Sequence, residues 1–254
     1  MDRADRLFHW LDRGFALALA TALTGVVVTA VPTLAHAETI SASGSVVSEQ
    51  RAISAEFDGI AVSGGIDLRV RQGAQQSAEV KAHANLLPYL ETVVEGRTLM
   101  VRWKRGSHLR LHQSPSVEVS AVKLQSVSSA GSSDVAIGAV KTPQLTLSIS
   151  GSGDVALESL AADELTVKIA GSGDFKVGGG QVGKLQVKVS GSGDVQTESM
   201  KADDVSISIA GSGDAKVHAD KSLVVSIAGS GDVLYRGDAQ VKSTVAGNGS
   251  VRKR

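Results

Sequence analysis

A four-residue phrase, Gly-Ser-Gly-Asp, recurs at nearly fixed spacing through the C-terminal half of this chain and constrains its fold more than any other feature. Successive copies begin 20 residues apart four times and then 18 residues apart twice. The copies are Gly131-Ser-Ser-Asp134, Gly151-Ser-Gly-Asp154, Gly171-Ser-Gly-Asp174, Gly191-Ser-Gly-Asp194, Gly211-Ser-Gly-Asp214, Gly229-Ser-Gly-Asp232 and the degraded Gly247-Asn-Gly-Ser250. A fixed period of this length indicates one supersecondary unit stacked on copies of itself.

Before each phrase, apolar residues occupy every second position, as in Leu145, Leu147 and Ile149. This period of two is typical of strands, and nothing in the repeat indicates an amphipathic helix. At about 3.3 Å per extended residue, one repeat traces about 65 Å, enough for one coil, and coils stacked about 4.8 Å apart pair with both neighbours. We therefore predict an all-β chain folded as a single-stranded parallel β-helix, or β-solenoid, with about 20 residues per coil. Connections between parallel strands are generally right-handed, so we expect a right-handed coil.

The Gly-Ser-Gly-Asp phrase is predicted to form the corner between two strands of a coil. Glycine adopts positive φ without a steric penalty, and the serine hydroxyl and aspartate carboxylate can accept hydrogen bonds from backbone N–H groups left unpaired by the bend. If the coils are in register, the aspartates form a column: Asp134, Asp154, Asp174, Asp194, Asp214 and Asp232. Their mutual repulsion can be offset by backbone N–H groups or by bound Ca²⁺. One carboxylate per coil favours the structural corner, so Ca²⁺ is the alternative and no other cofactor or metal is expected.

The N-terminus indicates export. Three arginines precede a long apolar run, and small residues at Ala35 and Ala37 offer a cleavage site before Glu38. This layout predicts a secretory signal peptide over residues 1–37. The alternative is an uncleaved membrane anchor, because about 20 apolar residues span a bilayer. We expect a periplasmic or cell-surface protein that contacts the membrane only through this segment, if it stays uncleaved.

The rest of the chain divides into three parts. Residues 38–55 are polar and small, which predicts a linker or a loosely attached first strand. Residues 56–129 have a longer, less regular β pattern, including a hairpin over 92–103 and a short helical turn near 85–90. We expect this part to cap the open end of the solenoid formed by residues 130–254, because exposed strand edges pair with other chains. At the other end the chain closes with Arg252-Lys253-Arg254, charges that discourage strand addition.

Composition excludes several functions. The chain of 254 residues has 26 acidic and 26 basic side chains, so no excess charge attracts nucleic acid. No cysteine is present, so disulfides and thiolate metal sites are excluded. Catalytic signatures such as Gly-x-Ser-x-Gly, His-Glu-x-x-His, a phosphate loop or a dinucleotide fingerprint are also missing, and we expect no enzyme activity.

One basic cluster is a candidate binding surface. It surrounds Trp103, which we expect to pack inward, and includes His108 and His112. A loop of this kind could dock an anionic polysaccharide, lipid head groups or a protein, and its alternative is a solvated hairpin face. The candidate residues for an anionic ligand are Arg102, Lys104, Arg105 and Arg110.

The segment Phe57-Asp-Gly-Ile-Ala-Val-Ser-Gly-Gly-Ile-Asp-Leu-Arg-Val-Arg-Gln-Gly73, together with the serial Gly-Ser-Gly-Asp phrases, resembles the GIN-domain family of auto-transporter adhesin heads. The resemblance covers residues 57–251 and implies a β-helical fold outside the cytoplasm and an adhesive role. It brings no catalytic residues. The chain departs from the pattern at Ser133, Asn248 and Ser250, in the two end coils.

Together these observations predict an exported, non-enzymatic β-solenoid that binds a surface glycan or an envelope protein. The alternatives are a carbohydrate-active enzyme (a glycan hydrolase or lyase) on a β-helix scaffold and a structural periplasmic spacer. The sequence leaves the ligand and the oligomeric state open.

Overall fold

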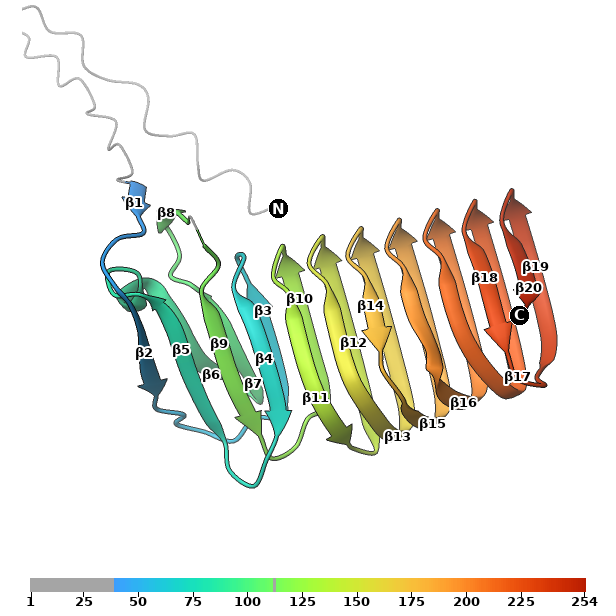
Figure 1. Ribbon diagram of the computed structural model, residues 1–254, viewed down its shortest axis with the longest axis horizontal. Coiled ribbons are helices and arrows are strands. Elements are labelled where there is room, and N and C mark those ends of the chain that lie inside the picture. The colour runs from blue at the N-terminus through green and yellow to red at the C-terminus, as the bar shows by residue number, and fades with distance from the viewer. Residues whose placement is uncertain (1–38, 112) are drawn as a thin grey trace, which may run out of the picture. The chain divides into compact units, whose positions relative to one another are not determined.

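The computed structural model of the protein describes residues 39–111 and 113–254 (Figure 1). The predicted signal peptide, its cleavage site between Ala37 and Glu38, and His112 lie outside these residues. Within the described part, no helix is long and apolar enough to cross a membrane. In chain order the elements are β1 (Thr39–Ser41), β2 (Val46–Arg51), β3 (Gly59–Ser63), β4 (Asp67–Gln72), β5 (Ser77–His83), the 3-10 helix η1 (Leu87–Tyr89), β6 (Leu90–Glu95), β7 (Thr98–Trp103), β8 (His108–Arg110), β9 (Ser116–Ala121), β10 (Ser126–Gly131), β11 (Val135–Lys141), β12 (Gln144–Gly151), β13 (Val155–Gly171), β14 (Phe175–Val177), β15 (Gly180–Gly191), β16 (Val195–Gly211), β17 (Ala215–Gly229), β18 (Asp232–Arg236), β19 (Gln240–Gly247) and β20 (Ser250–Lys253).

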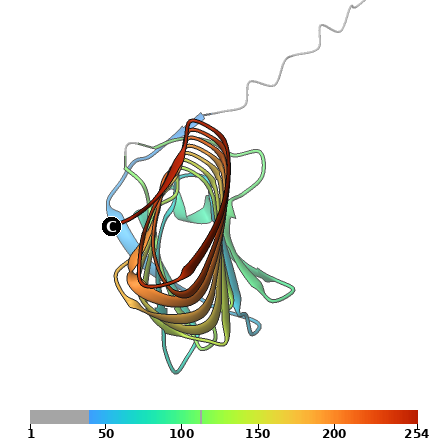
Figure 2. The same ribbon diagram turned by 90° about the vertical axis from the view of Figure 1, so that its right-hand side faces the viewer.

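Successive coils lie directly over one another with their residues in register. Leu147 of β12 pairs in parallel with Val167 of β13, which pairs with Val187 of β15. The columns continue through β16, β17 and β19, and Figure 2 shows the coils superimposed when viewed end-on. The predicted parallel β-solenoid is confirmed. Equivalent aliphatic residues share one core, as shown by Ile149, Ile169, Val189 and Ile209.

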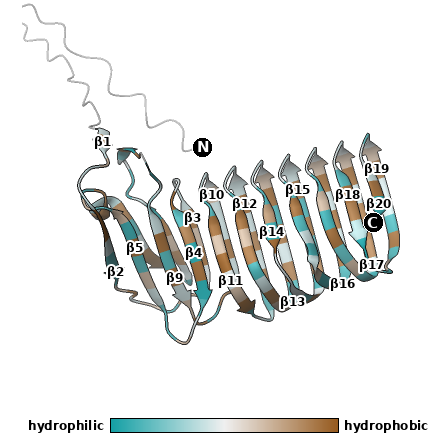
Figure 3. Ribbon diagram, in the orientation of Figure 1, coloured by the Kyte–Doolittle hydropathy of each residue, from teal (hydrophilic) through white to brown (hydrophobic). Residues whose placement is uncertain are grey.

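Each coil has two walls that meet at the Gly-Ser-Gly-Asp corner. The first wall contains β3, β7, β10 and β12, the C-terminal parts of β13, β15, β16 and β17, and β19. The second wall contains β4, β9 and β11, the N-terminal parts of β13, β16 and β17, and β14, β18 and β20. Along both walls inward apolar residues alternate with outward polar ones (Figure 3), because successive side chains of a strand point to opposite faces.

The order of the strands in the N-terminal region differs from their order in the chain. β3 and β4 pair in parallel with β10 and β11, so they form a coil directly below the first Gly-Ser-Gly-Asp coil. On their other side β3 and β4 pair with β7 and β9, which come later in the chain. The chain therefore forms the β3–β4 coil first, then the β7 and β9 layer on one side of it, and then the β10–β11 coil on the other side.

Antiparallel strands close the N-terminal end of the stack. β6 pairs with β7 through the predicted hairpin, which is confirmed, and β5 pairs with β9 and with β2. The helical turn expected near residue 85 is η1, and Figure 2 shows it within the outline of the coils. Leu87 and Leu90, at its two ends, are buried in the common core. This end of the aliphatic interior is thus covered. The small β1–β8 pair is a separate two-stranded sheet.

Candidate functional site

The two glycines of each corner are required by the coil below. Gly151 has a φ of +125°, a conformation that L side chains rarely adopt. A Cβ at Gly151 or at Gly153 would also lie within 3.0 Å of a backbone oxygen of the preceding corner, that of Gly131 or Ser133. The same overlap recurs at every later corner. Only glycine therefore lets successive corners stack this closely.

The aspartate carboxylate of each corner accepts a hydrogen bond from the coil above, which is the next coil along the chain. The backbone N–H of Asp154 donates to Oδ1 of Asp134 over 3.0 Å. The bond repeats with N···O distances of 2.8 to 3.0 Å up the column, from Asp174 to Asp154, Asp194 to Asp174, Asp214 to Asp194, and Asp232 to Asp214. Each carboxylate thus accepts a hydrogen bond from a backbone group that the bend leaves unpaired. The corner serines are exposed and, within the described chain, their hydroxyls make no such bond in Ser152, Ser172, Ser192 and Ser212.

The glycines of a corner contact the preceding coil, whereas its aspartate bonds the following coil. This difference explains why the two end coils depart from the Gly-Ser-Gly-Asp phrase. Below the first corner lies the β3–β4 turn rather than another Gly-Ser-Gly-Asp corner, so Ser133 fits in place of glycine, and its Oγ accepts a hydrogen bond from the backbone N–H of Ile66 over 3.0 Å. In the last corner no further coil follows among the described residues, and Ser250 replaces aspartate. Its backbone N–H and its hydroxyl both donate to Oδ1 of Asp232 over 2.8 Å.

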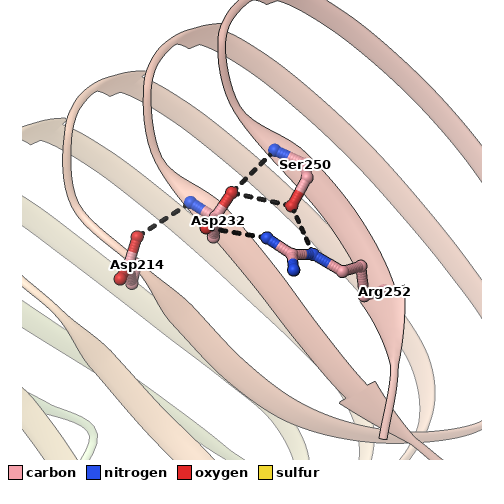
Figure 4. A network of polar contacts seen from close by, with 4 residues as sticks. All are labelled: Asp214, Asp232, Ser250 and Arg252. Carbon is pink, nitrogen blue, oxygen red and sulfur yellow. Dashed lines mark hydrogen bonds and ion pairs between the residues drawn. The ribbon is translucent and has the colours of Figure 1, made fainter.

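The top of the aspartate column forms a small polar network (Figure 4). Asp232 accepts the two bonds from Ser250, and Arg252 approaches its second carboxylate oxygen at 3.4 Å. Hydrogen bonding by Ser250, with a smaller contribution from the charge of Arg252, lowers the pKa of Asp232 below its usual value. This carboxylate is therefore stabilised in its ionised form by the protein itself.

The hydrogen bonds of the aspartate column disfavour cation binding. One oxygen of each carboxylate, from Asp134 to Asp232, is engaged by a backbone or side-chain donor of the next coil. No three histidine, aspartate or glutamate side chains converge as metal ligands in residues 39–111 and 113–254. Binding of Ca²⁺ by the column stays a prediction that the geometry does not favour.

The predicted basic cluster is partly neutralised. Arg102, on β7, contacts Glu91 at 3.2 Å and Glu95 at 2.5 Å. Its hydrogen bond lowers the pKa of Glu95. The half-buried Trp103 donates its indole N–H to the backbone oxygen of Gly64 over 2.8 Å. The cations exposed for an anionic ligand are those of the β7–β8 region: Lys104, Arg105 and Arg110.

A broader candidate is part of the outward surface of the first wall from β10 to β19, namely the three columns of side chains nearest the Gly-Ser-Gly-Asp corner, which we call the polar face. It consists of three in-register columns of mostly short side chains. The first column is Ser126, Thr146, Thr166, Gln186, Ser206, Val224 and Lys242. The second is Ser128, Ser148, Lys168, Lys188, Ser208, Ser226 and Thr244. The third is Ala130, Ser150, Ala170, Ser190, Ala210, Ala228 and Ala246.

These three columns contain no carboxylate and no aromatic side chain, and their charges are all positive. The adjoining fourth column of the same wall does carry acids, Glu164 and Asp204, and Glu164 lies 3.7 Å from Lys184 in that column. Lys168 and Lys188 lie directly opposite each other on adjacent coils, an arrangement that is unfavourable without an anion nearby. The second wall carries carboxylates on its outward side as well, those of Glu158 and Glu198. The polar face escaped the sequence analysis, although its residues are the ones that alternate with the predicted core.

Comparisons with known proteins agree with this fold. Residues 56–239 match the family described as "Putative auto-transporter adhesin, head GIN domain". A crystal structure of a putative adhesin from Bacteroides fragilis is 21% identical with a TM-score of 0.80, covering 85% of this chain and 100% of that one. A putative lipid binding protein from Parabacteroides distasonis is 25% identical with a TM-score of 0.72 and the same coverage. A putative adhesin from Parabacteroides merdae is 21% identical with a TM-score of 0.68, covering 85% of this chain and 99% of that one. No curated protein matches the chain.

Proposed function

Because the chain belongs to the family of auto-transporter adhesin head GIN domains, we propose that it is an exported, non-enzymatic binding module that attaches to an anionic glycan of a cell surface or envelope. The observation that carries this proposal is the polar face, with its in-register hydroxyl columns and positive charges. Hydroxyl groups donate and accept hydrogen bonds, and so match the hydroxyls of a sugar. Lysine ammonium groups attract carboxylate or sulfate groups on the same polymer.

The repetition of the face supports an extended ligand. Equivalent side chains recur about every 4.8 Å along the stack, the spacing of neighbouring strands. Each coil therefore offers a similar set of contacts to successive units of a polymer. Individually weak contacts add in this way to a useful affinity, as in other multivalent systems.

The proposal is tested by binding of the purified protein to an array of neutral, uronic-acid and sulfated glycans. We expect retention on anionic glycans that weakens as salt is added, because exposed charges are screened. Replacing the two adjacent lysines among the three exposed lysines of the face, with Lys168→Glu and Lys188→Glu, is expected to abolish it. The matched control is Lys176→Glu, an exposed lysine on the second wall, which should leave binding unchanged.

Three results would overturn the proposal. One is the absence of binding to any glycan, which would favour an envelope protein as partner or a structural spacer. Another is anionic-glycan binding that the lysine double variant leaves intact. The third is cleavage of a polysaccharide during incubation, which would establish the enzyme alternative.

A further inference from the structure

As far as the described strands go, the C-terminal end of the solenoid is open on its first wall. Within the described residues β19 pairs only with β17, so its other edge has no strand beside it. All eight residues of β19 are exposed. Val241 and Val245 continue the core columns of Leu223 and Ile227, yet they are 40% and 39% exposed. An uncovered strand edge with apolar side chains is a ready template for pairing with another chain.

Among the described residues, the N-terminal end has no equally exposed core column. Its interior is covered by Leu87 and Leu90, and its outer strands run antiparallel to the stack. A partner that covers the open core columns with matching columns of its own is therefore another C-terminal end.

We propose that a second copy of this chain covers the open end, through antiparallel pairing of β19 with the partner's β19 about a two-fold axis. An interface of this kind uses the same patch on both copies, as most homodimers do. Pairing makes one sheet of the two first walls, so inward residues must meet inward residues. Two aliphatic interiors then become continuous.

Side-chain chemistry selects one register. When pairing is centred on Ser243, Val241 lies opposite the partner's Val245, and the reverse contact repeats it. Ser243 meets the partner's Ser243, and each hydroxyl can bond the other. Lys242 lies opposite the partner's Thr244. Shifting the centre to Lys242 would place two ammonium groups opposite each other, and shifting it to Thr244 would separate the valines.

The second wall does not oppose this contact. The cations at its end are bound to carboxylates of their own chain: Arg252 to Asp232 at 3.4 Å, Lys253 to Asp238 at 3.0 Å and Arg254 to Glu198 at 3.1 Å. The charges expected to guard this edge are thus directed back along the preceding coils. β19 itself carries one charged side chain, that of Lys242.

Sedimentation of the purified protein across a dilution series tests the proposal. We expect a dimer whose dissociation constant rises about a hundredfold in Ser243→Lys, because two ammonium groups then face each other at the axis. Ser243 is exposed in the monomer, so the variant should fold normally. Ser226→Lys, at an exposed outward position of β17, is the control and should remain dimeric.

A cysteine provides an independent test of the register, because the chain contains no cysteine of its own. Oxidation of Ser243→Cys should give a disulfide-linked dimer, since the two Cα atoms at the axis lie within the usual span of about 4.4–6.8 Å. Ser226→Cys should not cross-link. A monomer at every concentration, or a dimer that Ser243→Lys does not weaken, would overturn the proposal. None of these outcomes depends on glycan binding.

Discussion

The most specific consequence of the corner geometry concerns Gly193→Ala. Gly193 does not have a positive φ, so alanine introduces no backbone strain and the effect is purely steric. The added Cβ would lie within 3.0 Å of the backbone oxygen of Gly173 and 2.9 Å from Cγ2 of Ile169. Overpacking of this kind costs about 1–3 kcal/mol. Because the overlapping atom is a backbone oxygen of the neighbouring coil, we expect a loss near the top of that range, about 3 kcal/mol.

The assay is equilibrium unfolding in urea followed by far-ultraviolet circular dichroism. Ser192→Ala is the matched control, because Ser192 belongs to the same corner and is exposed. It should change the free energy of unfolding by less than about 0.5 kcal/mol. If Gly193→Ala were as stable as this control, the claim that glycine is required by the preceding coil would be refuted.

Three further predictions follow from the aspartate column. Asp194→Ala removes the acceptor for the backbone N–H of Asp214, and should lower the free energy of unfolding by about 1–2 kcal/mol in the same assay. The lowered pKa of Asp232 contributes stability that is present above the ordinary carboxyl pKa of 3.8 and is lost as the pH falls through the folded-state pKa. Because the Ser250 amide donates to this carboxylate, its hydrogen exchange should accelerate, beyond its intrinsic pH dependence, only in that acidic range. Exchange that was equally protected there would contradict the assignment. Addition of Ca²⁺ or a chelator should leave the unfolding midpoint unchanged, whereas a rise with Ca²⁺ would show that the column binds it.

Much of this fold was predictable because the repeat carries two signals at once. The alternation in runs such as Leu145 to Ile149 predicts strands with one buried face, and the fixed period predicts their stacking. The corner was also predictable, since glycine and aspartate have clear roles in a bend. Which neighbouring coil each residue contacts could not be predicted, because only the strand register shows that Gly193 contacts the preceding coil and Asp194 the following one.

The N-terminal region was harder to predict for a physical reason. The β3–β4 coil lies between layers that come later in the chain, and no period in the sequence marks such an insertion. Pairing between distant strands depends on tertiary packing rather than on local propensity. The polar face was missed because no single outward residue type repeats from coil to coil, although most of its side chains are short and hydroxylated or small. Only the strand register shows that Lys168 and Lys188 lie side by side on one surface.

The central claim is that adjacent coils stack in register around one core, and a pair of engineered cysteines tests it most directly. Ser148 and Lys168 are register partners on adjacent coils, so their Cα atoms lie about 4.8 Å apart, within the span of a disulfide. Ser148 and Lys188 are two coils apart, about 10 Å, which a disulfide cannot bridge. We predict that oxidation forms an intramolecular disulfide in Ser148→Cys with Lys168→Cys and none in Ser148→Cys with Lys188→Cys. The opposite pattern, or no disulfide in either, would contradict the stacked solenoid.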